Sequence, residues 1–76
     1  MISGQYAVVL VYSTSYAIRA EKVLRRAGLR SKLVPVPRHL SSNCGVCLYV
    51  KHGDKDAAAE ALRAARVDIE GIYDME

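Results

Sequence analysis

Apolar and polar positions divide the first half of the chain into a strand, a helix and a second strand. Gln5–Tyr12 is rich in β-branched and aromatic residues without clear alternation, which predicts a strand buried on both faces. Ser13-Thr14-Ser15 supplies N-cap candidates for a helix over Tyr16–Ala27, which Gly28 ends. The spacing places five residues of this helix toward the core: Ala17, Ala20, Val23, Leu24 and Ala27.

Arg30–Val36 alternates well enough to predict a second strand, with Leu33 and Val34 as core candidates. Pro35 and Pro37 cannot donate to a central ladder, so we expect this strand at the edge of the sheet.

Gly45–Lys51 predicts a third strand that is at least partly covered on both faces. Val46, Leu48 and Val50 share one face, and Cys47 and Tyr49 share the other.

The last part of the chain predicts a turn, a helix and a strand. His52-Gly53-Asp54 is a turn before an alanine-rich helix over Lys55–Arg66. Val67–Met75 alternates and predicts a final strand with one face toward solvent. Its expected core side holds Val67, Ile69, Gly71, Tyr73 and Met75.

This order of elements, βαββαβ, predicts an α/β (α+β) protein with the ferredoxin-like sandwich fold. In that fold two helices pack on one face of a four-stranded antiparallel sheet. The length of 76 residues predicts one domain over 1–76, close to the size at which a single core just suffices and a homodimer would help.

Charge is unevenly distributed along the chain. Residues 1–52 hold eight Lys or Arg and one acid, whereas residues 53–76 hold three basic and seven acidic residues, within a net charge of +3. The longest apolar run is too short to span a bilayer and the start lacks a secretory pattern, so we expect no membrane association and a cytoplasmic protein. Its two cysteines are then reduced thiols rather than a structural disulfide.

The segment 35–47 is the one stretch with recognisable chemistry, because it holds both cysteines in a loop between two strands. In the predicted fold, Cys44 at the start of the third strand lies near Ser13 and Thr14 at the first helix's N-terminus. Free amides and the positive helix end stabilise a thiolate there, and Arg38 can add to this effect. We therefore predict that the pKa of the Cys44 thiol lies below that of a free cysteine.

The chain resembles a family of small bacterial domains described as selenium/sulfur carrier-like. The resemblance runs over nearly the whole chain and is most specific at Pro37-Arg38, Ser41-Ser42 and Cys44-Gly45. The other matching positions are Ser13-Thr14, Ala17, Glu21, Leu24, Gly28, Pro35 and Glu70-Gly71-Ile72-Tyr73. The resemblance implies that Cys44 is the carrier thiol and that Arg38, Ser41 and Ser42 shape its loop.

Such a carrier accepts sulfur or selenium as a persulfide or selenenylsulfide and relays it, so it is a relay protein rather than a turnover enzyme. The amides of Ser42 and Asn43 could hold the terminal anion, and Gly45 permits close backbone packing. Cys47 could release the cargo by attacking Cys44, or it is a small core residue. The expected partners are a donor such as a cysteine desulfurase and an acceptor protein, and no cofactor is expected beyond the cargo.

Three other classes of function are weighed against the carrier interpretation: metal binding, docking and nucleic-acid binding. Cys44-x-x-Cys47 could bind zinc or copper, although one such pair lacks the four ligands of a closed zinc site. A docking or regulatory domain would need neither cysteine. We expect no nucleic-acid partner, because Tyr49 is the only aromatic residue in the predicted third strand.

Overall fold

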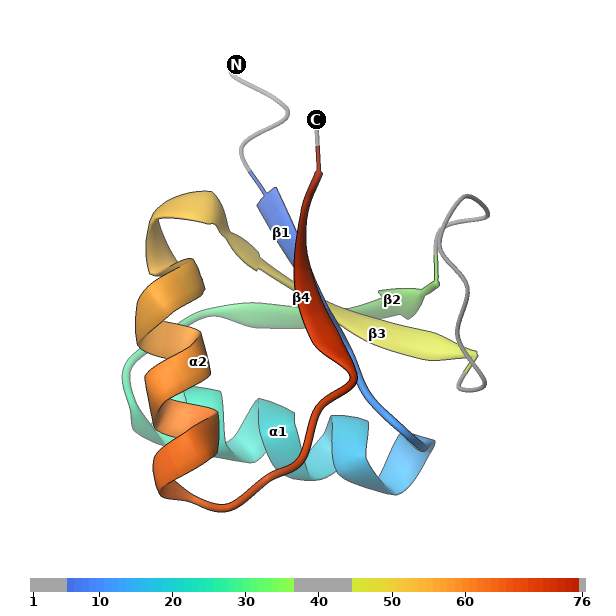
Figure 1. Ribbon diagram of the computed structural model, residues 1–76, viewed down its shortest axis with the longest axis horizontal. Helices are drawn as coiled ribbons and strands as arrows, with labels where there is room; N and C mark the ends of the chain where they lie inside the picture. Colours follow the sequence, from blue (N-terminus) through green and yellow to red (C-terminus); the bar gives the residue numbers. More distant parts are fainter. Residues whose placement is uncertain (1–5, 37–44, 76) are drawn as a thin grey trace.

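The computed structural model describes residues 6–36 and 45–75, which form an α+β fold (Figure 1). Helices and strands follow each other as predicted, with a short 3-10 helix before the second α-helix. The elements are β1 (Tyr6–Leu10), α1 (Thr14–Arg26), β2 (Ser31–Pro35), β3 (Val46–Lys51), the 3-10 helix η1 (His52–Asp54), α2 (Lys55–Ala64) and β4 (Gly71–Met75). In these ranges no helix is long and apolar enough to cross a membrane.

The four strands form one antiparallel sheet in the order β2-β3-β1-β4. β1 and β3 are central neighbours, and β2 is an edge strand, as the prolines predicted. The observed order is compatible with the ferredoxin-like arrangement.

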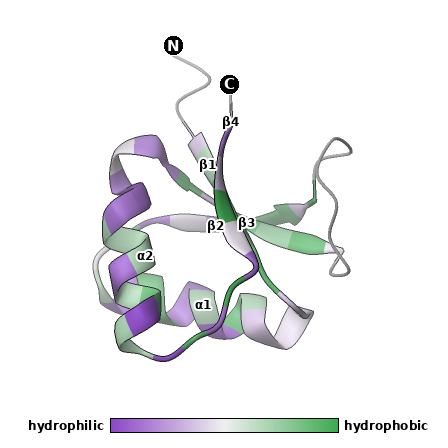
Figure 2. Cartoon of the chain, viewed as in Figure 1, coloured by the Kyte–Doolittle hydropathy of each residue, from purple (hydrophilic) through white to green (hydrophobic). Residues whose placement is uncertain are grey.

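Both helices pack against the same face of the sheet and form the larger core. In Figure 2 the central strands are mostly green, whereas both helices mix purple and green along their length. This core is built from Ala7, Val9 and Val11 of the first strand segment, Ala17, Ala20 and Leu24 of α1, Leu48 and Val50 of β3, Ala58 and Leu62 of α2, and Val67. Because alternate residues of a strand point to opposite faces, Val8, Leu10 and Cys47 form a second, smaller cluster on the other face.

The ends of α1 follow from their local sequence. Ser13 is the N-cap in extended conformation, and its Oγ accepts a hydrogen bond from the Tyr16 amide at 3.4 Å. Gly28 has a φ of +80°, a left-handed conformation that glycine adopts without steric cost. Arg66, just after α2, also has a positive φ, of 59°, although it carries a side chain.

Three predictions of core positions are wrong. Ala27 is exposed because it is the C-cap residue and lies beyond the last turn of α1. Leu33 is 37% exposed because β2 is the outer strand and little covers its side chain.

The third error concerns β4, whose inward side is opposite to the prediction. Ile72 packs against the helix-side core, whereas Tyr73 is 46% exposed. Val67 and Ile69 do contact the core, but they belong to the connection before the strand. Their spacing therefore does not set which side of β4 faces inward.

Candidate functional site

The base of the cysteine loop is fixed by the pairing of β2 with β3. Pro35 lies opposite Val46, and one step further the Val36 amide donates to the Gly45 carbonyl at 3.2 Å. Gly45 is exposed. Five predicted site residues lie outside the described residues: Arg38, Ser41, Ser42, Asn43 and Cys44.

Pairing between β1 and β3 brings the loop base to the same edge as the start of α1. Leu10, the last residue of β1, lies opposite Cys47 near the start of β3. Ser13 caps α1 only three residues after Leu10, so the helix N-terminus and Gly45 extend from neighbouring strand ends. This is the edge relation that the predicted topology required.

The N-terminus of α1 presents the positive end of the helix dipole at this edge. Its first turn contains no acidic side chain that would neutralise the positive end of the helix dipole. The Ser13 side chain caps the Tyr16 amide and the Ser13 carbonyl accepts from Ala17, while Thr14 is exposed at the first helical position.

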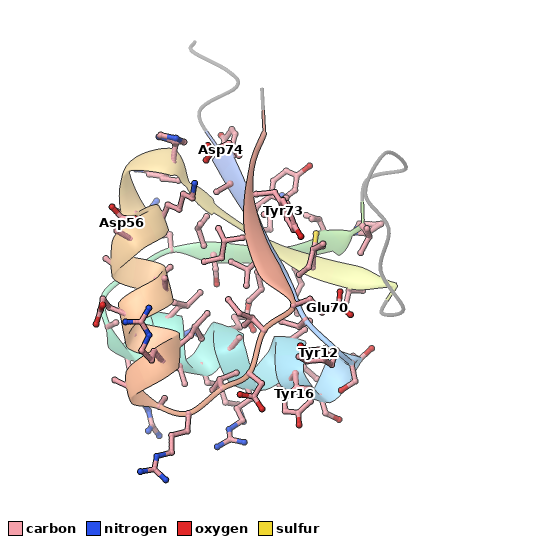
Figure 3. All side chains as sticks on the ribbon, in the orientation of Figure 1. Tyr12, Tyr16, Asp56, Glu70, Tyr73 and Asp74 are labelled. Carbon is pink, nitrogen blue, oxygen red and sulfur yellow. The ribbon has the colours of Figure 1, made fainter. Side chains whose placement is uncertain are left out.

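Two tyrosines and one acid also lie at this edge, as Figure 3 shows. The rings of Tyr12 and Tyr16 meet edge to face with centroids 6.2 Å apart. The Glu70 amide donates to the Leu10 carbonyl at 2.7 Å, which ties the connection before β4 to the end of β1.

Cys47 lies in the sheet with a fully buried side chain. It packs with Val8 and Leu10, and Val34 borders the same cluster. Its Sγ lies 3.9 Å from the Pro35 carbonyl oxygen, the length of a weak sulfur hydrogen bond. This position agrees with the small-core-residue interpretation, and a part for Cys47 in sulfur release stays a prediction.

A separate charged cluster lies where β3 ends and α2 begins. Asp74 Oδ1 contacts Lys55 Nζ at 3.0 Å and His52 Nε2 at 3.2 Å. The hydrogen bond from Lys55 is the main cause that lowers the pKa of the exposed Asp74 carboxyl. Sequence reasoning missed this cluster because it placed Asp74 on the solvent side of β4.

Metal binding by the Cys44 and Cys47 pair stays a prediction. Within 6–36 and 45–75, no group of three or more His, Cys, Asp or Glu side chains could hold a metal ion. Cys44, the first residue of the proposed metal pair, is outside those ranges.

Comparison with known proteins identifies the family of this chain. No curated protein and no solved structure matches the chain significantly. Residues 6–74 match the family described as "Putative Se/S carrier protein-like". That match spans both strand ends, the α1 N-terminus and the whole cysteine loop, so the chain belongs to the Se/S carrier-like family.

Proposed function

We propose that this protein carries sulfur or selenium on Cys44, on a ferredoxin-like scaffold in the reducing cytoplasm, and passes it to a partner. The observation that carries the proposal is the family match over residues 6–74, which includes Cys44-Gly45. The described geometry supports it, since the segment after Cys44 leaves from the sheet edge where α1 begins.

Loading transfers one atom without a net change in oxidation state. A donor enzyme such as a cysteine desulfurase presents a persulfide, and the Cys44 thiolate attacks its outer sulfur. A new sulfur–sulfur bond forms on Cys44 as the donor's bond breaks, and the donor cysteine leaves as a thiolate. A selenium donor gives the corresponding selenenylsulfide.

The loaded anion needs positive charge and hydrogen-bond donors close to it. Arg38 supplies charge, and the amides of Ser42 and Asn43 together with the Ser41 hydroxyl supply donors. Ser13 and Thr14 contribute the positive end of α1, which no acid in the first turn offsets.

Two release routes balance chemically. A partner thiolate can attack the outer atom and take it as a new persulfide, which returns Cys44 as a thiolate. Alternatively, Cys47 attacks the Cys44 sulfur, hydrosulfide leaves, and the two cysteines end as a disulfide that an external dithiol must reduce.

Burial of Cys47 favours the first route in this conformation. A fully buried thiol must leave its contacts with Val8 and Leu10 before it can attack anything outside the sheet. The acceptor is therefore a protein with its own nucleophile. Cys47 remains a buried packing residue of the sheet during the relay.

The test is intact mass after incubation with a cysteine desulfurase and cysteine, or with a selenium donor. The wild type and Cys47→Ala are expected to gain a reductant-sensitive sulfur or selenium atom, and Cys44→Ser is expected to gain none. Loading of Cys44→Ser, or no loading of any form, would contradict the proposal. Zinc or copper retained in the native mass would favour metal binding instead.

A further inference from the structure

The sheet face opposite the helices carries a regular arrangement of side chains that the strand registers fix. We call it the open sheet face. It consists of Tyr6, Val8 and Leu10 of β1, Lys32 and Val34 of β2, Cys47, Tyr49 and Lys51 of β3, and Gly71 and Tyr73 of β4. In the described part of the chain, no helical residue packs against the cluster at its centre.

Three tyrosines lie on this face, on three neighbouring strands. The rings of Tyr6 and Tyr49 have centroids 5.9 Å apart and planes inclined by 30°. Tyr49 and Tyr73 flank Val8 on its two sides, so their strands lie two spacings, or about 10 Å, apart. Tyr6 is 45% and Tyr73 is 46% exposed, and Figure 3 shows Tyr73 on the side of β4 away from α2.

Positive charge borders the rings on one side. Lys32 lies opposite Tyr49, and Lys51 lies opposite Tyr6. Both lysines and Arg30 line a shallow hollow of about 580 Å³ together with the two rings, and none of the described residues that line it is acidic. Asp74, on the neighbouring β4, is on the helix side of the sheet, where it binds Lys55.

We propose that the open sheet face binds single-stranded nucleic acid. Bases stack on the three tyrosines, and phosphates pair with Arg30, Lys32 and Lys51. Aromatic rings on a sheet with cations beside them are the features that single-strand binders combine, and stacking accepts any base. The hollow is too open to enclose a small ligand, whereas an extended chain can cross several strands.

This proposal reverses the sequence-based expectation of no nucleic-acid partner. That expectation counted aromatic residues on the third strand alone and assigned Tyr6 and Tyr73 to packing. The registers place all three tyrosines on one face.

The test is fluorescence anisotropy of a short labelled oligouridine with the full chain at low salt, repeated with oligothymidine. Tyr6→Leu and Tyr73→Leu are each expected to weaken binding by at least about fivefold. Tyr12→Leu is the matched control, because Tyr12 is 52% exposed but lies beyond the end of β1, where its ring contacts Tyr16 of α1. Urea unfolding of each variant confirms that it is folded at the assay temperature.

Salt dependence tests the cations separately. Lys51→Gln is expected to reduce the slope of log affinity against log salt by about 0.7, the value for one phosphate contact on a single strand. Lys22→Gln on α1 is the control and is expected to leave the slope unchanged.

Three results would overturn the proposal. The oligonucleotide could fail to bind at low salt, or Tyr6→Leu and Tyr12→Leu could weaken its binding equally. Polyglutamate could also displace the oligonucleotide while no tyrosine variant changes the affinity. The last result would show attraction of an acidic polymer by charge alone. Cys44→Ser is expected to bind like the wild type, so this test is independent of the carrier proposal.

Discussion

Replacing Cys47 by serine is expected to destabilise the protein more than replacing it by alanine. Alanine removes one buried sulfur from the cluster with Val8 and Leu10, which costs about 1 kcal/mol in transfer free energy and residual cavity. Serine removes the same sulfur and adds a hydroxyl, whose transfer out of water costs about 1 to 3 kcal/mol where no well-placed hydrogen bond compensates it. The Pro35 carbonyl lies 3.9 Å from Sγ, whereas an O–H···O bond needs about 2.5 to 3.0 Å, so serine cannot keep that contact without a shift.

The difference is large relative to the total stability. A chain of 76 residues has an unfolding free energy of about 4 to 11 kcal/mol. Urea unfolding followed by circular dichroism measures each midpoint, and equal slopes show that the same surface is exposed. A serine variant as stable as the alanine variant would contradict the apolar packing of Cys47 with Val8 and Leu10 as the source of the difference.

This prediction also guides the choice of variants for the carrier test. If Cys47→Ser unfolds readily, its failure to load sulfur would not show whether the Cys47 thiol takes part in loading. Cys47→Ala removes the thiol at a smaller cost, so its loading behaviour reports on the chemistry.

Other predictions concern the turn after α2, the edge strand β4 and the exposed ion cluster. Arg66→Gly is expected to raise the unfolding free energy by about 1 kcal/mol, because a φ of 59° is strained for a residue with a side chain; urea unfolding measures it. Gly71→Ala is expected to displace the Tyr73 ring, because the added Cβ would lie 3.1 Å from ring atoms; the ring's NMR shifts report the displacement. Lys55→Gln is expected to raise the pKa of Asp74 toward its ordinary value in an NMR titration, because the main cause of the lowering is removed.

The pH dependence linked to Asp74 has a definite sign. Its pKa is lower in the folded state, so its contribution to stability is present above the unfolded pKa and is lost as the pH falls through the folded pKa. Lys55→Gln should therefore weaken the acid dependence of stability.

No gain from Arg66→Gly would mean that the side chain contributes as much as its backbone conformation costs. Unchanged Tyr73 shifts in Gly71→Ala would disprove the ring's position over Gly71. An unaltered Asp74 titration in Lys55→Gln would show that the 3.0 Å contact is not maintained in solution.

Element order and the central strands could be predicted because their patterns are strong. The uninterrupted apolar run in β1 matches a strand whose residues Ala7 to Leu10 are buried on both faces. The start of α1 was predictable to within the Ser13-Thr14-Ser15 run because a serine or threonine hydroxyl can cap a helix, and Gly28 marked its end because glycine, without a Cβ, adopts a positive φ.

The inward side of β4 could not be predicted because the pattern does not reveal where that strand begins. Val67 and Ile69 share the parity of Tyr73, but they contact the core from the connection. Two long-range contacts also fix this strand, and local spacing reveals neither of them. They are the backbone hydrogen bond from Glu70 to Leu10 and the ion pair of Asp74 with Lys55.

The sheet edge that holds Ser13 and Gly45 was predictable, whereas Cys44 lies outside the described residues and its placement stays a prediction. Antiparallel pairing in the predicted topology sufficed to place the start of β3 beside the start of α1, and Leu10 opposite Cys47 agrees with it. The open sheet face was missed because it depends on the registers of three strands together.

The central claim is that Cys44 holds the transferred atom. The most direct measurement is fragment-ion mass spectrometry of the protein purified, with immediate alkylation, from cells supplied with sulfide or selenite. Fragments that separate Cys44 from Cys47 are expected to place the added sulfur or selenium on Cys44. An added atom on Cys47 alone, or an unmodified Cys44 under both supplies, would contradict the account.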